Sequence, residues 1–167
     1  RYSNRMPTVI TLTLPLDELD PRWQTRLLDT ELVTRHTLNG DIRSGSINQW
    51  GMIEPELLAR MTFESFDTKG SRASGTQMQS LEIAYQMALN FAQEPDGWLV
   101  FIGPSGSGKT HLSVSVANER LKKKQDVRYF LVADLLDQLR EAFNPESAFS
   151  YYKLFDQVRS SDLLILR

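Results

Sequence analysis

The chain has 167 residues, of which 41% are hydrophobic and 24% charged, and its formal net charge at pH 7 is −2. This composition is typical of one globular domain, and the overall charge does not indicate a nucleic-acid or membrane partner. There is no cysteine, which excludes disulfide bonds, thiolate metal sites and a cysteine nucleophile. The apolar runs are far shorter than the roughly 20 residues of a membrane helix, and no signal peptide opens the chain. We therefore expect a soluble cytoplasmic protein with no membrane partner.

The first part of the chain predicts short elements followed by a linker. Residues 8–16, TVITLTLPL, are rich in β-branched side chains and predict a strand. The segment DELDPRWQTRLLD predicts a helix, with Asp17 or Asp20 as its N-cap and Pro21 at the first helical position. Residues 36–46, HTLNGDIRSGS, have the composition of turns and linkers, so they are the best candidate for a boundary.

Helical patterns follow this boundary. EPELLARMTFESFD predicts a short helix, followed by two phenylalanines, Phe63 and Phe66. We expect these two side chains in the core, with the wall of an adenine pocket as the alternative. Residues 74–92 carry apolar side chains at helical spacing and predict a long amphipathic helix.

From residue 98 onward, predicted strands alternate with predicted helices. Asp134 is the expected N-cap of the second of these helices. This alternation favours an α/β sandwich with a mostly parallel sheet. Strands are expected at 98–102, 127–132 and 162–166, and helices at 109–124, 134–143 and 151–159.

The turn after the strand at 98–102 reads GPSGSGKT and matches G-x-x-x-x-G-K-[ST] at every required position. Its glycines let the backbone wrap closely, so that successive N–H groups point at phosphate oxygens, and the following helix presents its positive end to the same anion. Lys109 would reach the β- and γ-phosphates, and the hydroxyl of Thr110 would ligate Mg²⁺. The motif therefore predicts a nucleoside triphosphate site. Its residues are Gly103, Pro104, Ser105, Gly106, Ser107, Gly108, Lys109 and Thr110.

The segments FESFD, GWLVFIGPSGSGKTHLSVSVANERL, VADLLDQLREAF and DLLIL together resemble the AAA+ ATPases of the DnaC/DnaI type, which are bacterial replicative helicase loaders. The related transposition helper ATPase IstB has the same signature. His111, directly after the phosphate loop, also fits the pattern and joins the expected nucleotide-binding residues. The resemblance implies the three-layer sandwich of a P-loop NTPase, with ATP and Mg²⁺ as cofactors.

The order of the segments differs from that of the family. There, the LLIL strand runs into a pair of Walker B acids and a helix, and then into a stretch similar to RYSNRMPTVITLTLPLDELDPRWQTRLLD. In this chain that stretch comes first, the acids are missing, and Arg167 follows LLIL. Residues 1–43 thus resemble the C-terminal part of the AAA+ core, 44–75 form a linker and lead-in segment, and 76–167 resemble the nucleotide-binding core up to the Walker B strand.

Two origins fit this order. The first is a circular permutation that folds as one domain, in which the strand at 8–13 would lie beside the strand at 163–166. The second is a fragment that spans the end of one ATPase unit and the start of the next, or an assembly artefact of the gene.

The resemblance also suggests catalytic residues near the start of the chain. Thr13 aligns with the polar sensor-1 residue, which is usually an asparagine in the family. Arg22 and Arg26 lie four apart on one predicted helical face, and the second of such a pair acts as an arginine finger in related ATPases. An arginine finger reaches the nucleotide of a neighbouring subunit, so this role implies a homo-oligomer in which no subunit completes its own site. The alternative is an exposed helix with two solvated arginines.

Other signals are weaker. ERLKKK, at 119–124, predicts favourable charge at a helix C-terminus, with contact to DNA phosphates as the alternative. His36 and His111 have no partners at metal-ligand spacing.

Three functions remain open. The first is an ATP-binding AAA+ module that remodels a DNA-bound replicative helicase, with single-stranded DNA as a possible further partner. The second is a transposition helper that acts with a transposase. The third is a nucleotide-dependent assembly switch that does not hydrolyse ATP, since the Walker B acids are absent.

Overall fold

The computed structural model describes residues 4–37, 51–69, 75–142 and 151–167. The predicted linker at 36–46 lies outside these ranges except for its first two residues. The strands are β1 (Thr8–Leu12), β2 (Val33–Thr37), β3 (Trp98–Ile102), β4 (Val127–Phe130) and β5 (Leu163–Leu166). The helices are the 3-10 turn η2 (Leu16–Glu18), α1 (Pro21–Leu27), α2 (Pro55–Arg60), α3 (Gly75–Gln93), α4 (Lys109–Lys122), α5 (Val132–Glu141) and α6 (Tyr151–Ser160).

The five strands form one parallel sheet in the order β2-β3-β1-β5-β4. The α/β sandwich with a mostly parallel sheet is thereby confirmed. β1, from the start of the chain, lies in the centre, where Thr8 pairs with Trp98 on one side and with Leu164 on the other. The prediction that the first strand lies beside the last is therefore confirmed. Strands from both ends of the chain share one sheet, and the origin of this order stays a prediction.

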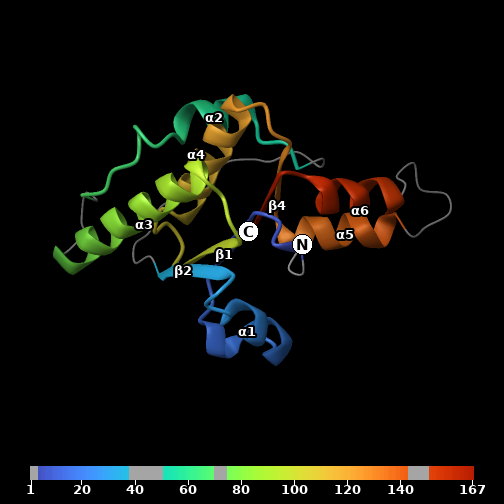
Figure 1. The fold of residues 1–167 in the computed structure, drawn as a ribbon, viewed down its shortest axis with the longest axis horizontal. Coiled ribbons are helices and arrows are strands. Elements are labelled where there is room, and N and C mark those ends of the chain that lie inside the picture. Colours follow the sequence, from blue (N-terminus) through green and yellow to red (C-terminus); the bar gives the residue numbers. More distant parts are fainter. Residues whose placement is uncertain (1–3, 38–50, 70–74, 143–150) are drawn as a thin grey trace.

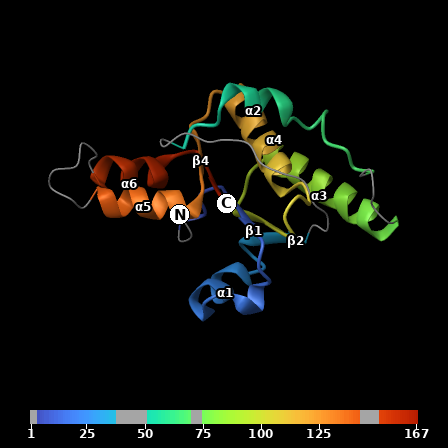
Figure 2. The same ribbon diagram turned by 180° about the vertical axis from the view of Figure 1, so that it is seen from behind.

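Helices cover both faces of the sheet (Figure 1). α2, α3 and α4 lie on one face, α1 lies on the other, and α5 and α6 lie side by side next to β4, as the reverse view in Figure 2 also shows. We call these the α4 face and the α1 face. Successive side chains of a strand point to opposite faces, and β3 follows this rule. Leu99 and Phe101 join the core on the α4 face, whereas Trp98 and Val100 join the smaller cluster under α1.

The structure corrects several predicted boundaries. β1 ends at Leu12, and β4 ends at Phe130. α5 begins at Val132, and its N-cap is Leu131, so the prediction of Asp134 as the cap is wrong. The backbone N–H of Val132 donates to the carbonyl oxygen of Arg167 at 2.8 Å, which satisfies a free amide of the first turn without a side-chain cap. Asp134 lies inside that first turn instead.

One strand was not predicted from the sequence. β2 forms an edge of the sheet, and only Val33 of its five residues is buried. Its other residues are polar and at least partly exposed, so the apolar alternation that marks a half-buried strand is missing. In α1, by contrast, the predicted start is confirmed. The side chain of Asp20 accepts a hydrogen bond from the backbone N–H of Arg22, and Pro21 is the first residue.

Candidate functional site: the phosphate loop

The loop between β3 and α4 is built on two glycines in the left-handed region. Gly106 has φ = 77° and Gly108 has φ = 92°, values that other residues rarely adopt. Gly108 also has no room for a side chain, because an added Cβ would lie 2.8 Å from Cε2 of Phe66. At the start of the loop, the backbone N–H of Gly103 donates to the carbonyl oxygen of Leu12 at 3.3 Å. This bond holds the start of the loop against the end of β1, at the carboxyl edge of the sheet.

Lys109 lies across this loop. Its ammonium donates to the carbonyl oxygens of Gly103 at 2.7 Å and Pro104 at 2.6 Å, and Oγ of Ser107 lies 3.4 Å away. The residue is 7% exposed. Burial lowers the pKa of Lys109, and the nearby charge of Arg167 lowers it further. The ammonium thus lies among backbone carbonyl oxygens at the amino end of a 14-residue helix, and the amino end of a helix favours anions such as phosphate.

Beside the loop, Thr110 and two side chains from other elements come together. The Tyr129 hydroxyl, from β4, is buried and makes no hydrogen bond of good geometry within the described part of the chain. Burial raises the pKa of Tyr129, while the adjacent charge of Arg167 and the side chain of Thr110 act in the opposite direction. Neither Tyr129 nor Arg167 was predicted as part of the site. Arg167 could have been predicted, because it directly follows the last strand and the loop directly follows β3, and the carboxyl ends of parallel strands meet at one edge of the sheet.

His111 and Phe66 brace the loop from the side of the 61–66 segment. Nε2 of His111 lies 2.9 Å from the carbonyl oxygen of Thr62, so the ring donates there, and Ser65 Oγ lies 3.2 Å from the same nitrogen. The Phe66 ring meets the His111 ring edge-on at 5.1 Å, and burial lowers the pKa of His111. His111 therefore anchors the 61–66 segment to α4.

Phe63 and Phe66 differ in their surroundings. Phe63 is 5% exposed and belongs to the core on the α4 face, which confirms the core prediction for that residue. Phe66 packs against this core and stacks on Tyr85 with 6.0 Å between ring centroids. The contact between Phe66 and Gly108 joins segments 42 positions apart in the chain, so no local pattern indicates it.

The predicted catalytic residues from the start of the chain fall into two groups. Thr13 is exposed and follows β1 at the carboxyl edge, next to the residue that bonds Gly103. Arg22 and Arg26 lie on α1, across the sheet from α4 (Figure 1). The Arg22 side chain is 90% exposed and pairs with Asp20 at 3.3 Å, and Arg26 is exposed. The structure therefore brings Thr13 near the loop, but it places the two arginines on another face.

The basic segment at 119–124 has a structural role. The Arg120 guanidinium is buried and donates to the carbonyl oxygens of Ala92 and Gln93 at the end of α3, each at 3.2 Å. Lys123 also donates to Gln93, at 3.0 Å, and Lys122 pairs with Glu119. These contacts tie α4 to the C-terminus of α3.

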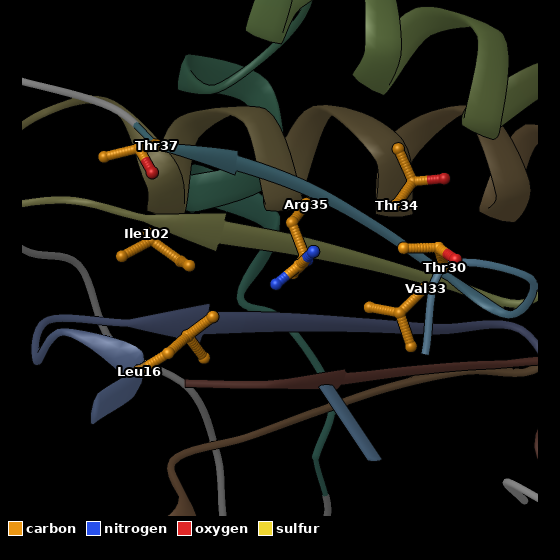
Figure 3. Close-up of a pocket in the computed structure, with 7 residues that line it drawn as sticks. All are labelled: Leu16, Thr30, Val33, Thr34, Arg35, Thr37 and Ile102. Carbon is orange, nitrogen blue, oxygen red and sulfur yellow. The ribbon is translucent and has the colours of Figure 1, made fainter. Parts of the chain in front are cut away.

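An open cavity of about 540 Å³ lies elsewhere, at β2 and the end of β3. Figure 3 shows the Arg35 side chain among its lining residues, which are Leu16, Thr30, Val33, Thr34, Arg35, Thr37 and Ile102. None of them belongs to the loop at 103–110, although Ile102 directly precedes it. Within the described ranges, no group of three or more histidine or acidic residues could hold a metal ion, and no helix is long and apolar enough to cross a membrane.

Comparisons with known proteins agree with this geometry. A family model described as IstB-like ATP binding protein matches residues 24–167, so the chain belongs to the family of IstB-like ATP-binding proteins. This confirms the resemblance drawn from the phosphate loop and its flanking segments. No solved structure gave a significant match.

Individual relatives fall into two groups. The chain is 31% identical over 93 residues to the replicative helicase loader DnaC of Escherichia coli K12, which covers 54% of this chain and 36% of that protein. It is 25% identical over 111 residues to DnaC of Buchnera aphidicola subsp. Baizongia pistaciae, covering 66% of this chain and 43% of the relative. The putative ATP-binding protein of insertion sequence IS232 from Bacillus thuringiensis subsp. berliner is 38% identical over 56 residues, 34% of this chain and 22% of that protein. The chain thus spans less than half the length of these relatives.

Proposed function

We propose that this chain binds ATP through residues 103–110 and that the bound nucleotide controls its action on a DNA-bound partner protein. The observation that carries the proposal is the buried Lys109 ammonium, held among backbone carbonyls at the amino end of α4. A phosphate chain offers this cation oxygens with a negative charge, which bind an ammonium more strongly than neutral carbonyls do. Membership of a family of ATP-binding proteins supports ATP as the nucleotide.

The test of this proposal is an ATP titration of the purified chain and of Lys109→Ala. Loss of a charge-assisted contact raises the dissociation constant by about tenfold to a hundredfold. Lys122→Ala is the matched control, since Lys122 is a cation on the same helix that pairs with Glu119. A dissociation constant of Lys109→Ala for ATP equal to that of the wild type would overturn the proposal.

For the partner, we propose a replicative DNA helicase first, because several relatives are replicative helicase loaders. The second candidate is a transposase, because the matching family is IstB-like and one relative is an ATP-binding protein of an insertion sequence. ATP-dependent co-purification with the helicase or with the transposase of the same genome distinguishes the two. Binding to single-stranded DNA and a cytoplasmic location stay predictions.

Hydrolysis is a separate question. If Arg26 acts as a finger on a neighbouring subunit, the chain forms oligomers, and Arg26→Ala lowers ATP turnover without changing ATP affinity. Thr13→Ala would lower turnover through the same transition state, and Arg22→Ala would act more weakly. Turnover of the chain, measured alone and with DNA, separates these roles from a switch that does not hydrolyse ATP. The predicted Mg²⁺ would have Thr110 as its ligand, and this also stays a prediction.

A further inference from the structure

The strand β5 places one arginine at the edge of the sheet where the phosphate loop lies. The backbone of Arg167 is fixed on the β4 side, because its N–H donates to the carbonyl oxygen of Phe130 at 3.0 Å and its own carbonyl accepts from Val132 at 2.8 Å. On the other side, Leu166 pairs with Ile10 of β1, and β1 in turn pairs with β3, which leads into the loop. All these strands are parallel, so their carboxyl ends meet at one edge.

The side chain of Arg167 adds positive charge at this edge. Residue 167 is exposed, and its guanidinium is not in any ion pair with a carboxylate of the described residues. Its charge acts on Lys109 and on the Tyr129 hydroxyl, which is buried beside Thr110 without a hydrogen bond of good geometry. Two cations and the Tyr129 hydroxyl thus gather around the loop. An anion with several oxygens could accept hydrogen bonds from all three, and its negative charge binds an ammonium more strongly than the carbonyl oxygens that Lys109 contacts.

This arrangement does not fit Mg²⁺ well. In P-loop proteins the ion is held by the loop serine or threonine together with an acidic residue from a nearby strand. Here Thr110 supplies a neutral hydroxyl, and the strand end supplies a guanidinium, which repels a dication.

We propose that Arg167 binds the phosphate chain of the nucleotide as a second cation beside Lys109, so that nucleotide binding by this chain does not require Mg²⁺. A guanidinium presents two parallel N–H donors and can hold two phosphate oxygens at once, which offsets part of the charge that the ion offsets elsewhere. Tyr129 and Thr110 donate to the same oxygens. This inference rests on the proposed ATP binding at residues 103–110.

The experiment is an ATP titration of the whole chain with excess MgCl₂ and, in parallel, with excess EDTA. We expect the two dissociation constants to agree within about threefold, because the protein contacts are the same in both buffers. Arg167→Ala should raise the dissociation constant in EDTA by about tenfold to a hundredfold, and Arg167→Lys by less, since it keeps the charge but not the paired donors. Arg167→Asp should bind ATP only with MgCl₂, because it supplies the acidic ligand.

Arg140→Ala is the matched control, because Arg140 is an exposed arginine that pairs with Asp137 on α5. Wild-type binding that is lost in EDTA overturns the inference and leaves the proposed function standing. Equal affinity of Arg167→Ala and wild type in EDTA also overturns it. If the wild type binds ATP in neither buffer, the proposed function itself fails. The wild-type comparison needs no variant, so it does not depend on how well the variants fold.

Discussion

The two faces of the sheet differ in how they hold the side chains proposed to act in function. On the α4 face, three helices bury a large core, and Lys109, His111 and Phe66 are fixed against it by contacts within the chain. On the α1 face, α1 covers a smaller cluster, and its candidate side chains, Arg22 and Arg26, are exposed, with Arg22 paired to Asp20. The proposed phosphate site is therefore built from contacts within this chain, whereas the proposed role of the arginines requires a neighbouring subunit.

The largest expected effect is a loss of stability, and one core substitution on each face compares the two cores. Phe101 is fully buried on the α4 face, and Phe101→Ala should lower the free energy of unfolding by about 3–5 kcal/mol. Leu27 is 2% exposed under α1, and Leu27→Ala should cost about 2–5 kcal/mol, toward the lower end because the cluster around it is smaller. Urea unfolding followed by circular dichroism measures both values.

The same measurement tests whether the two faces form one unit. β1 lies at the centre of the sheet and contributes to both faces, with Val9 in one cluster and Ile10 in the other. We therefore expect one cooperative transition in which tryptophan fluorescence and circular dichroism coincide. Separate transitions in Leu27→Ala would show that residues 4–37 unfold independently of the phosphate-loop core.

The next effect concerns nucleotide affinity. Gly108→Ala would place a methyl group 2.8 Å from the Phe66 ring on a backbone with φ = 92°, so the loop must distort. We expect the dissociation constant for ATP to rise by about a hundredfold, since displaced loop amides lose their contacts with the phosphates. Gly75→Ala is the control, because nothing lies within 4 Å of an added Cβ there. Unchanged affinity of Gly108→Ala would mean that the Phe66 contact does not shape the site.

These glycines also show how much the sequence could predict. The strand and helix that flank the loop at 103–110 were predicted correctly, because the motif has glycine, lysine and threonine at fixed local spacing between a strand and a helix. Phosphate binding by the loop stays a prediction. The partners of the loop were not predicted. Phe66 reaches Gly108 from 42 positions away. Tyr129 lies near Thr110 and Arg167 near Tyr129, which depends on β4 and β5 lying side by side next to β1. Such contacts depend on strand order, which local patterns do not specify.

On the α1 face, a helix start was predicted correctly but a whole strand was not predicted. Its cap and first helical residue were predicted from Asp20 and Pro21, yet β2 was missed because an edge strand with polar residues lacks an apolar alternation. The proposed roles of Thr13, Arg22 and Arg26 come from the family resemblance alone. All three residues are exposed, as contact with a neighbouring subunit requires.

A smaller loss of stability is expected when one arginine from each face is replaced by alanine. Arg120→Ala removes a buried guanidinium that holds two carbonyl oxygens at the end of α3, and should cost about 1.5–3 kcal/mol of stability. Arg22→Ala removes an exposed ion pair with Asp20 and should cost below about 1 kcal/mol. Thermal unfolding of both variants gives the comparison. A larger loss in Arg22→Ala would show that α1 depends on its surface charges more than on the Leu27 cluster.

The smallest effect is the dependence of stability on pH. Burial lowers the pKa of His111 and of His36 below the ordinary value of 6.5, and hydrogen bonds to the carbonyl oxygens of Thr62 and Ser80 oppose this only in part. Between the folded and unfolded pKa values, the unfolded chain binds more protons than the folded chain. The free energy of unfolding should therefore fall as the pH drops from neutral through 6.5 to about 5.5, above the range of ordinary carboxylates.

Glutamine variants assign this pH dependence to its source. His111→Gln retains a donor for Thr62 but cannot titrate, so its stability should vary less with pH than that of the wild type. His36→Gln should do the same at β2, where Ser80 provides the acceptor, and the double variant should show the flattest profile. Urea unfolding at neutral pH and at about pH 5.5 measures the difference. Equal stability of the wild type at both pH values would contradict the expectation for both histidines. If His111→Gln alone flattens the profile, the α4 face is the pH-sensitive part, because its histidine holds the 61–66 segment against the phosphate loop.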